Sequence, residues 1–243
     1  MAEVWIGTSG YVYRHWRAGI FYPPALPPRE ELAWYAGRFR TVELNNPFYR
    51  APSRENFIRW SASTPQGFLF AVKVPRVVSH TRRLRETREP LARFLEAAGE
   101  LGPKLGPLLV QLPPQFHLHL GTLEDFLATI PPSHRWVLEV RHPSWQVPDV
   151  YERLAARGMA LCVPVGGRVQ PDLVTTADFT YIRMHAGEEP GGGFGEEQLV
   201  LWAGRIRALA RSGKDVYVYF NNDRGGHAPR DAARLGALLR PSG

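Results

Sequence analysis

Short apolar runs recur along the whole chain and are separated by more polar, amphipathic stretches. Eight of these runs are four to seven residues long, are rich in Val, Ile, Leu, Phe and Tyr, and end at Gly, Pro, Asn or a charged residue. They cover residues 4–7, 41–44, 68–74, 108–112, 136–140, 160–163, 179–184 and 216–220. Near-continuous apolar runs of this length predict strands that are buried on both faces, as in a parallel sheet.

Most intervals between the predicted strands carry a helical pattern. Helices are expected over residues 29–39, 53–63, 89–101, 149–157 and 196–210, with a short helix opening at Thr122 and a last one beginning at Ala228-Pro229. Residues 164–178 have little helical signal, so we expect an irregular connection there.

The alternation of strand and helix predicts the fold class. Eight units of about 30 residues fit an α/β fold, a single TIM-type (β/α)8 barrel of parallel strands that spans residues 1–243 as one domain. An open doubly wound sheet is the alternative, but the first turn, residues 7–11, lacks the Gly-x-Gly-x-x-Gly spacing common in such sheets.

Composition excludes several classes of protein. The chain is 44% hydrophobic and 22% charged, which is a globular balance, and no apolar run approaches the roughly 18 residues of a membrane helix. The first residues show no secretory signal. The one cysteine, Cys162, excludes an internal disulfide framework and lies in an apolar run, where we expect it to be buried. We therefore expect a cytoplasmic protein without a membrane partner.

The charge is unusual in its distribution. Lys and Arg number 30 against 23 acidic residues, a net charge of +7, and only Lys73, Lys104 and Lys214 are lysine. The stretch 73–93 holds seven basic and two acidic residues. This balance permits an anionic small molecule or nucleic acid as a partner, although the preference for arginine is equally consistent with genome composition or heat tolerance.

Polar side chains follow the predicted strands at their C-terminal ends, where barrel enzymes carry their active sites. Because side chains alternate along a strand, Glu139 and Arg141 share a face, as do Arg183 and His185. Four of the five asparagines form two pairs at such ends. The candidate catalytic residues are Glu43, Lys73, Glu139 and His185, and the candidate substrate-binding residues are Tyr11, Trp16, Asn45, Asn46, His80, Gln111, Arg141, Arg183, Asn221 and Asn222.

Several of these residues lie in motifs that resemble the YecE-like family, "domain of unknown function 72". The motifs are Gly7-Thr8-Ser9-Gly10-Tyr11, Thr41-Val42-Glu43-Leu44-Asn45-Asn46, His80-x-x-Arg83-Leu84, Gln111-x-Pro113-Pro114, Glu139-x-Arg141-x-x-Ser144-Trp145, Arg183-x-His185 and Tyr219-x-Asn221-Asn222. The resemblance covers essentially the whole chain and implies a (β/α)8-type barrel, but no established activity. Pro47 departs from the pattern, because a small hydroxyl residue commonly follows the first asparagine pair.

Three kinds of chemistry are compatible with these residues. Glu43 and Glu139 could act as an acid and a base, or form structural ion pairs with Lys73 and Arg141. No cofactor is firmly implied; a labile divalent metal is an alternative, although nearby arginines would repel it. Lys73, Arg141 and Arg183 could bind an anion, for which arginine is well suited. Ser9 has no neighbouring base in the sequence, and no acyl-transfer motif is present.

We therefore expect an enzyme that acts on a phosphate-bearing or other anionic substrate, for example a phosphodiesterase or nuclease-like hydrolase. Two alternatives stay open. One is a carbohydrate-active barrel that uses Glu43 and Glu139. The other is a non-catalytic module that binds nucleic acid or protein through residues 73–93.

Overall fold

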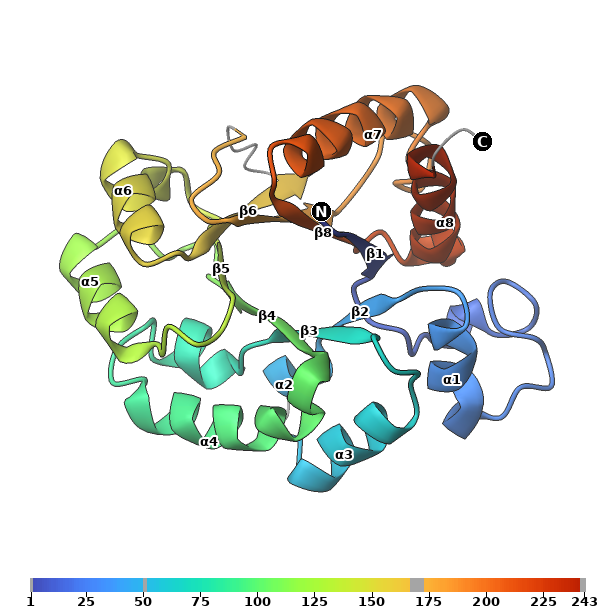
Figure 1. Ribbon diagram of the computed structural model, residues 1–243, viewed down its shortest axis with the longest axis horizontal. Coiled ribbons are helices and arrows are strands. Elements are labelled where there is room, and N and C mark those ends of the chain that lie inside the picture. Colours follow the sequence, from blue (N-terminus) through green and yellow to red (C-terminus); the bar gives the residue numbers. More distant parts are fainter. Residues whose placement is uncertain (1, 50–51, 167–172, 241–243) are drawn as a thin grey trace.

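The structure, a computed structural model, describes residues 2–49, 52–166 and 173–240. Eight parallel strands surround a central axis, and the helices pack outside them (Figure 1). The strands are β1 (Val4–Thr8), β2 (Thr41–Leu44), β3 (Leu69–Lys73), β4 (Leu105–Gln111), β5 (Trp136–Glu139), β6 (Ala160–Val165), β7 (Phe179–Met184) and β8 (Asp215–Phe220). Each of them overlaps a predicted apolar run, so the predicted barrel of parallel strands is confirmed.

The barrel closes between β1 and β2. The other neighbouring strands pair in parallel ladders. Between β1 and β2, Ser9 and Glu43 form an isolated parallel bridge, with the Gly10 amide donating to the Glu43 carbonyl at 2.8 Å. Gly7 allows this close approach, because a Cβ there would lie 2.2 Å from the Thr41 carbonyl oxygen. Barrel closure therefore depends on residues at the C-terminal end of β1.

The helices follow the strands in order, with one interruption. They are α1 (Glu31–Ala36), α2 (Asn46–Tyr49), α3 (Arg54–Ala62), α4 (Arg88–Ala98), α5 (Leu120–Thr129), α6 (Pro148–Ala156), α7 (Glu196–Arg211) and α8 (His227–Leu239). Between β6 and β7, the described residues 166 and 173–178 contain no helix, as the weak signal there predicted. None of the helices in the described ranges has the length and hydropathy to span a bilayer.

Three local elements differ from the prediction. The helix expected over residues 29–39 is divided into a 3-10 turn (Pro28–Glu30) and α1, because the prolines at 27 and 28 fix an extended entry and Gly37 ends the helix. The loops after β2 and β3 contain the short helix α2 and a π-helical turn (Val77–Thr81). Both turns lie at the C-terminal end of the barrel, next to the candidate site.

The lumen of the barrel is filled by side chains of one strand parity. Its apolar layers contain Ala71, Leu109, Val137, Cys162, Tyr181, Tyr217 and Tyr219. A second, larger apolar cluster lies between the strands and the surrounding helices. Cys162 is buried, as expected, and burial raises the pKa of its thiol. Two residues further along β3, β4, β5, β7 and β8, the inward positions are polar and form the top layer of the barrel: Lys73, Gln111, Glu139, Arg183 and Asn221.

Candidate functional site

A cavity of about 460 Å³ opens at the C-terminal end of the barrel. The loops after β1 and β2 and the ends of β3, β4, β5, β7 and β8 all contribute to its wall. Its lining residues are Gly10, Tyr11, Val12, Tyr13, Asn45, Asn46, Tyr49, Lys73, Gln111, Arg141, Arg183, His185, Asn221 and Asp223. The structure thus brings nine of the fourteen candidate residues to one cavity, with Glu43 and Glu139 buried against Arg183 in its floor.

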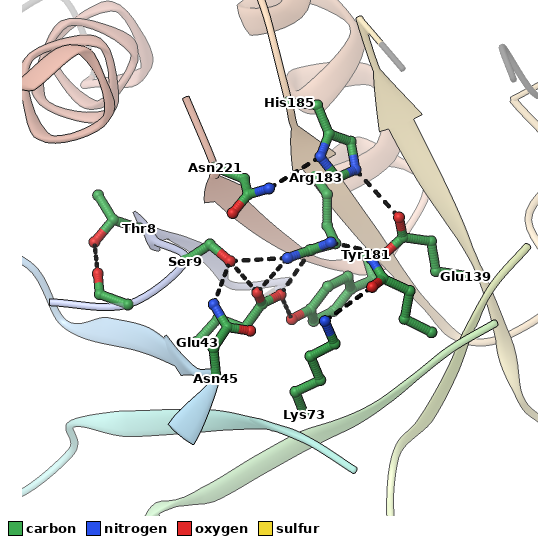
Figure 2. A network of polar contacts seen from close by, with 12 residues as sticks. Thr8, Ser9, Glu43, Asn45, Lys73, Glu139, Tyr181, Arg183, His185 and Asn221 are labelled. Carbon is green, nitrogen blue, oxygen red and sulfur yellow. Dashed lines mark hydrogen bonds and ion pairs between the residues drawn. The ribbon is translucent and has the colours of Figure 1, made fainter. Parts of the chain in front are cut away.

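Arg183 is the centre of that floor (Figure 2). Its Nε and Nη2 donate to the two carboxylate oxygens of Glu43 at 3.0 and 2.7 Å, and its Nη1 donates to Glu139 Oε2 at 2.8 Å. Nη2 also donates to Ser9 Oγ at 2.8 Å. Four of the five N–H groups of Arg183 are therefore used inside the protein.

The two carboxylates are ionised anchors for this arginine. Burial alone would raise the pKa of Glu43, but the charge of Arg183 and hydrogen bonds from Arg183, Ser9 and Tyr181 outweigh it and hold that pKa below its usual range. The same competition lowers the pKa of Glu139, through the charge of Arg183 and hydrogen bonds from His185 and Gln111. The ion pairs expected with Lys73 and Arg141 are thus made by Arg183 instead.

Lys73 reaches the cavity from the end of β3 and has an unusual environment. Its side chain is 6% exposed, its Nζ donates to Gln111 Oε1 at 2.8 Å, and the Nζ lies 3.9 Å from the centre of the Phe48 ring. In the described part of the chain, no carboxylate lies within ion-pair distance of this amine. Burial, with the nearby charge of Arg183, lowers the pKa of Lys73 to about 8.

A hydrogen-bonded chain runs from Lys73 across the cavity. Gln111 Nε2 donates to Glu139 Oε2 at 2.9 Å, and His185 Nε2 lies 3.2 Å from the other oxygen of Glu139. The amide of Asn221 donates to His185 Nδ1 at 3.1 Å. Because Nδ1 accepts this bond, the neutral His185 ring carries its proton on Nε2, and this N–H group donates a hydrogen bond to Glu139. His185 is therefore fixed in one orientation from both sides.

Two groups at the cavity have unused bonding capacity. Arg141 is exposed at the rim, and its guanidinium makes no ion pair with any carboxylate of the described residues. Asn45 donates from Nδ2 to Ser9 Oγ at 2.9 Å, but its buried Oδ1 accepts no hydrogen bond from the described residues. Such groups are available to a ligand: one to an anion, the other to a hydroxyl or amine donor.

The donor set does not fit a divalent cation. Within residues 2–49, 52–166 and 173–240, no group of three or more His, Cys, Asp or Glu side chains lies close enough together to hold a metal ion. Glu43 and Glu139, the two acids expected to bind one, are both bonded to the Arg183 guanidinium, whose positive charge would repel a cation.

Three candidate residues lie outside the cavity wall. Trp16 is fully buried among Tyr13, Phe21 and Tyr22, and its Nε1 donates to the Asp223 carbonyl at 3.3 Å. It fastens the loop after β1 to the loop after β8. Trp16 therefore packs the loop onto the barrel and does not line the cavity in which a substrate would bind.

The other two are His80 and Asn222. The His80 ring meets the edge of Phe48 at 4.9 Å between centroids, and burial together with Lys73, Arg76 and Arg141 lowers the pKa of His80 to about 4. Neutral His80 thus supports the ring on which Lys73 lies. Asn222 points away from the cavity, where its amide donates to the Gly192 carbonyl at 3.0 Å and to Asp231 Oδ2 at 2.9 Å.

Two site residues were absent from the sequence-based set. Ser9 donates to Glu43 and accepts from Asn45 and Arg183, so its hydroxyl is saturated and held away from a nucleophilic role. Tyr181 donates its hydroxyl to Glu43 Oε2 at 2.6 Å. The signal for Tyr181 was available, because it lies two residues before Arg183 on the same face of β7. Ser9 stands in the Gly7-Thr8-Ser9-Gly10-Tyr11 motif, but its bonding partners follow from the closure of β1 against β2.

A second hollow, of about 590 Å³, lies at the opposite end of the barrel. Its basic lining residues donate to neighbouring groups: Arg135 donates to Asp215 and Tyr217, Arg157 to the Ile130 carbonyl, and Lys214 to the Ala177 carbonyl. In (β/α)8 barrels the N-terminal end usually contributes to stability, whereas active sites lie at the C-terminal end. The candidate site is therefore the C-terminal cavity.

Comparison with known proteins identifies the family. The family described as "Protein of unknown function DUF72" matches residues 5–243. The chain belongs to this family. Among its relatives, UPF0759 protein YunF of Bacillus subtilis (strain 168) is 27% identical, with 97% of this chain and 94% of YunF covered. UPF0759 protein YecE of Escherichia coli (strain K12) is 31% identical over 158 residues, which cover 64% of this chain and only 55% of YecE.

A solved structure of the family agrees with the fold. A DUF72 family protein from Thermotoga maritima MSB8 is 29% identical and superposes with a TM-score of 0.87, covering 98% of this chain and 99% of that one. The DUF72 protein and this chain therefore share one barrel architecture. The resemblance inferred from the sequence motifs is confirmed, and the family's activity is, by its own description, not established.

Proposed function

We propose that this DUF72 protein is an enzyme that acts on a small anionic substrate, such as a phosphate ester, in the C-terminal cavity. The observation that carries the proposal is a pair of cations, Lys73 and Arg141, that line the cavity without a carboxylate partner among the described residues. The acids beneath them are already neutralised by Arg183. An arriving anion therefore meets these two cations; the Asp223 carboxylate also lies on the wall, 3.5 Å from His15 Nε2.

Each residue has a distinct part in this proposal. Arg141 binds the anionic group, for which the planar guanidinium offers two parallel donors. Lys73, whose pKa is about 8, takes or delivers a proton near neutral pH. Asn45 accepts a hydrogen bond from the substrate through its free Oδ1. Glu43, Glu139 and Arg183 are positioning residues that keep the floor rigid, in contrast to the acid–base role first expected for the two glutamates.

The carbohydrate-active alternative has weaker support. A glycosidase needs one carboxylic acid whose pKa is raised so that it can protonate the leaving oxygen. Here the pKa values of both Glu43 and Glu139 are lowered, and both side chains are bonded to the same arginine beneath the cavity. We therefore favour an anionic substrate over a neutral sugar.

Binding of inorganic phosphate tests the first part of the proposal. Isothermal titration of the intact protein should detect phosphate binding that weakens about tenfold or more in Arg141→Met, because one charge-assisted contact is lost. Arg211→Met, at the opposite end of the barrel on α7, is the matched control and should leave the affinity unchanged. Equal weakening in both variants, or no binding at all, would contradict the proposal.

A substrate panel tests the second part. Phosphomonoesters, phosphodiesters and aryl glycosides should be offered to the protein and to Lys73→Met. Turnover of a phosphate-bearing compound that is lost in Lys73→Met supports the proposal. Turnover of aryl glycosides alone would favour the carbohydrate alternative and overturn ours.

A second candidate function rests on the loop after β3. Arg76, Arg83, Arg85 and Arg88 are exposed there and form no ion pair with the described residues. Non-glycine residues in this loop, Arg83, Leu84 and Glu86, have positive φ angles of 47°, 68° and 49°. Strained backbone of this kind is concentrated at functional sites. A single-stranded nucleic acid binding along this loop would fit the charge.

Salt dependence distinguishes the second candidate. Oligonucleotide affinity should fall steeply as salt rises, and the slope should decrease in Arg83→Glu/Arg85→Glu. The Arg141→Met variant should bind the oligonucleotide like the unmodified protein if the loop alone is used. An affinity that does not respond to the loop substitutions would remove this candidate.

A further inference from the structure

We propose that Lys73 is the nucleophile of the reaction and forms an imine with the carbonyl carbon of an anionic aldehyde or ketone. This inference rests on the proposed function, since it uses the same cavity and the same anion-binding Arg141. It adds the chemical class of the substrate, a carbonyl compound that also carries a phosphate or carboxylate group. It also assigns Lys73 a covalent role in place of simple proton transfer.

The position of the amine supports a nucleophilic role. The Lys73 Nζ lines the cavity from a rigid strand end, has one amide acceptor in Gln111, and lies over the Phe48 ring. By contrast, Lys104 Nζ is saturated by the Ser61 carbonyl at 2.6 Å and the Thr64 carbonyl and hydroxyl at 2.7 and 3.1 Å. Lys214 lines the hollow at the opposite end of the barrel, where its Nζ donates to the Ala177 carbonyl at 2.9 Å. Lys73 is the lysine whose amine lies in the C-terminal cavity, on the same wall as Arg141.

The choice of residue type is itself informative. Of the 30 basic residues in this chain only three are lysine, so arginine is the ordinary cation of this protein. Arginine binds a phosphate or carboxylate at least as well as lysine does, but it stays protonated and cannot act as an amine nucleophile. A lysine at the cavity, beside the anion-binding candidate Arg141, indicates a need for a group that loses its proton. The lowered pKa, about 8, makes the neutral amine accessible near neutral pH.

The proposed step is balanced without a further reagent. The neutral Nζ attacks the carbonyl carbon and forms the N–C bond, which gives a carbinolamine after the proton moves to oxygen. The C–O bond then breaks, and the oxygen leaves as water with the two protons that the amine carried. No oxidation or reduction occurs. The rigid chain of Gln111, Glu139 and His185 keeps the amine and the cavity wall in place during this exchange.

Reductive trapping tests the imine directly. The intact protein is incubated with glyceraldehyde 3-phosphate or pyridoxal 5′-phosphate, both phosphate-bearing aldehydes, and then reduced with sodium borohydride. Peptide mass spectrometry should find the reduced adduct on Lys73 about tenfold more often than on Lys104 or Lys214, because Lys73 combines a lowered pKa with a place beside Arg141 in the cavity. Inorganic phosphate should suppress labelling of Lys73 alone.

Two variants complete the experiment. Lys73→Arg keeps the charge and should lose the adduct while it still binds phosphate, and Lys104→Arg should label like the unmodified protein. Even labelling of the three lysines, or no adduct with either aldehyde, would overturn the imine. If phosphate still binds in an Arg141-dependent manner in that case, the imine fails and the proposed function stands. If phosphate does not bind either, both fail.

Discussion

Arg183 is the residue on which the buried polar layer depends, because it compensates two carboxylates that have almost no contact with water. Arg183→Met should leave Glu43 and Glu139 buried without a counter-charge and lower the free energy of unfolding by about 3–5 kcal/mol. Chemical denaturation measures this loss. Arg93→Met is the control, since its pair with Glu89 is exposed and should contribute little. Equal effects of the two substitutions would contradict the role given to Arg183.

The buried ammonium group of Lys73 should lower the free energy of unfolding of the protein. Its folded pKa of about 8 lies below the usual 10.5, so a stability penalty is fully present below pH 8 and disappears as the pH rises to 10.5. The penalty corresponds to roughly 3 kcal/mol, less about 1 kcal/mol for the lost hydrogen bond to Gln111 in a variant. The charged groups that set this pKa are Arg183, Glu43, Glu139 and Arg141, and His80 faces the amine across Phe48.

Lys73→Met should therefore raise the melting temperature at pH 7, by an amount that shrinks as the pH approaches 10.5. Thermal unfolding followed by circular dichroism over this pH range measures it. A substitution that destabilises the protein equally at every pH would show that the ammonium is not penalised by burial.

The structure brings many of the predicted site residues together, but with partners that the sequence did not indicate. Glu43, Glu139 and Arg183 were predicted to meet because each lies at the C-terminal end of a predicted strand, and the structure brings them together. The sequence could not show that Arg183 would form ion pairs with both Glu43 and Glu139. That pairing follows from strands β2, β5 and β7 facing each other across the lumen, which is a three-dimensional property.

The two asparagines after β8 illustrate how an extended segment divides neighbouring residues. Asn221 continues the inward face and contacts His185, whereas Asn222 points outward to Gly192 and Asp231. Both were predicted to bind substrate, and the alternation along the strand could already have separated them. Substituting each asparagine in turn therefore compares a residue of the cavity, Asn221, with a residue that only supports the fold, Asn222.

Asn222→Ala should lower the free energy of unfolding by about 1–2 kcal/mol, because two buried hydrogen bonds are lost. Asn221→Ala should leave stability nearly unchanged. It should also remove the hydrogen bond to His185 Nδ1 that keeps the proton on Nε2, and nitrogen NMR of the imidazole ring should then detect both tautomers. Should both variants lose stability and leave His185 unchanged, the division between them would be wrong.

Strands were predictable because burial on both faces leaves a continuous apolar run, and each run became a strand. Short irregular elements were not. The helix α2 (Asn46–Tyr49) and the π-helical turn (Val77–Thr81) are too short to produce a recognisable amphipathic period in the sequence. They are held by tertiary contacts such as the packing of His80 on Phe48. These elements surround Lys73, so the environment of the amine was the least predictable part of the site.

The barrel as a whole depends on the closure of β1 against β2. Gly7→Ala would place a methyl group against the Thr41 backbone and force the two strands apart. We expect a loss of about 3 kcal/mol or more of unfolding free energy, because backbone cannot relax as a side chain does. Gly204→Ala, where a Cβ has open space on α7, is the control and should be tolerated. Denaturation of both variants decides the matter, and a tolerated Gly7→Ala would mean that closure does not need this approach.

The central claim concerns one amine in an anion-binding cavity at the mouth of the barrel, and the chain's three lysines make it directly measurable. Protein labelled with ¹³C at lysine should give three Cε signals in NMR spectra, followed over pH with and without inorganic phosphate. We predict one signal, absent from Lys73→Met, that titrates near pH 8 and moves when phosphate is added. A Lys73 signal that titrates near 10.5, or one that ignores phosphate, would contradict the account.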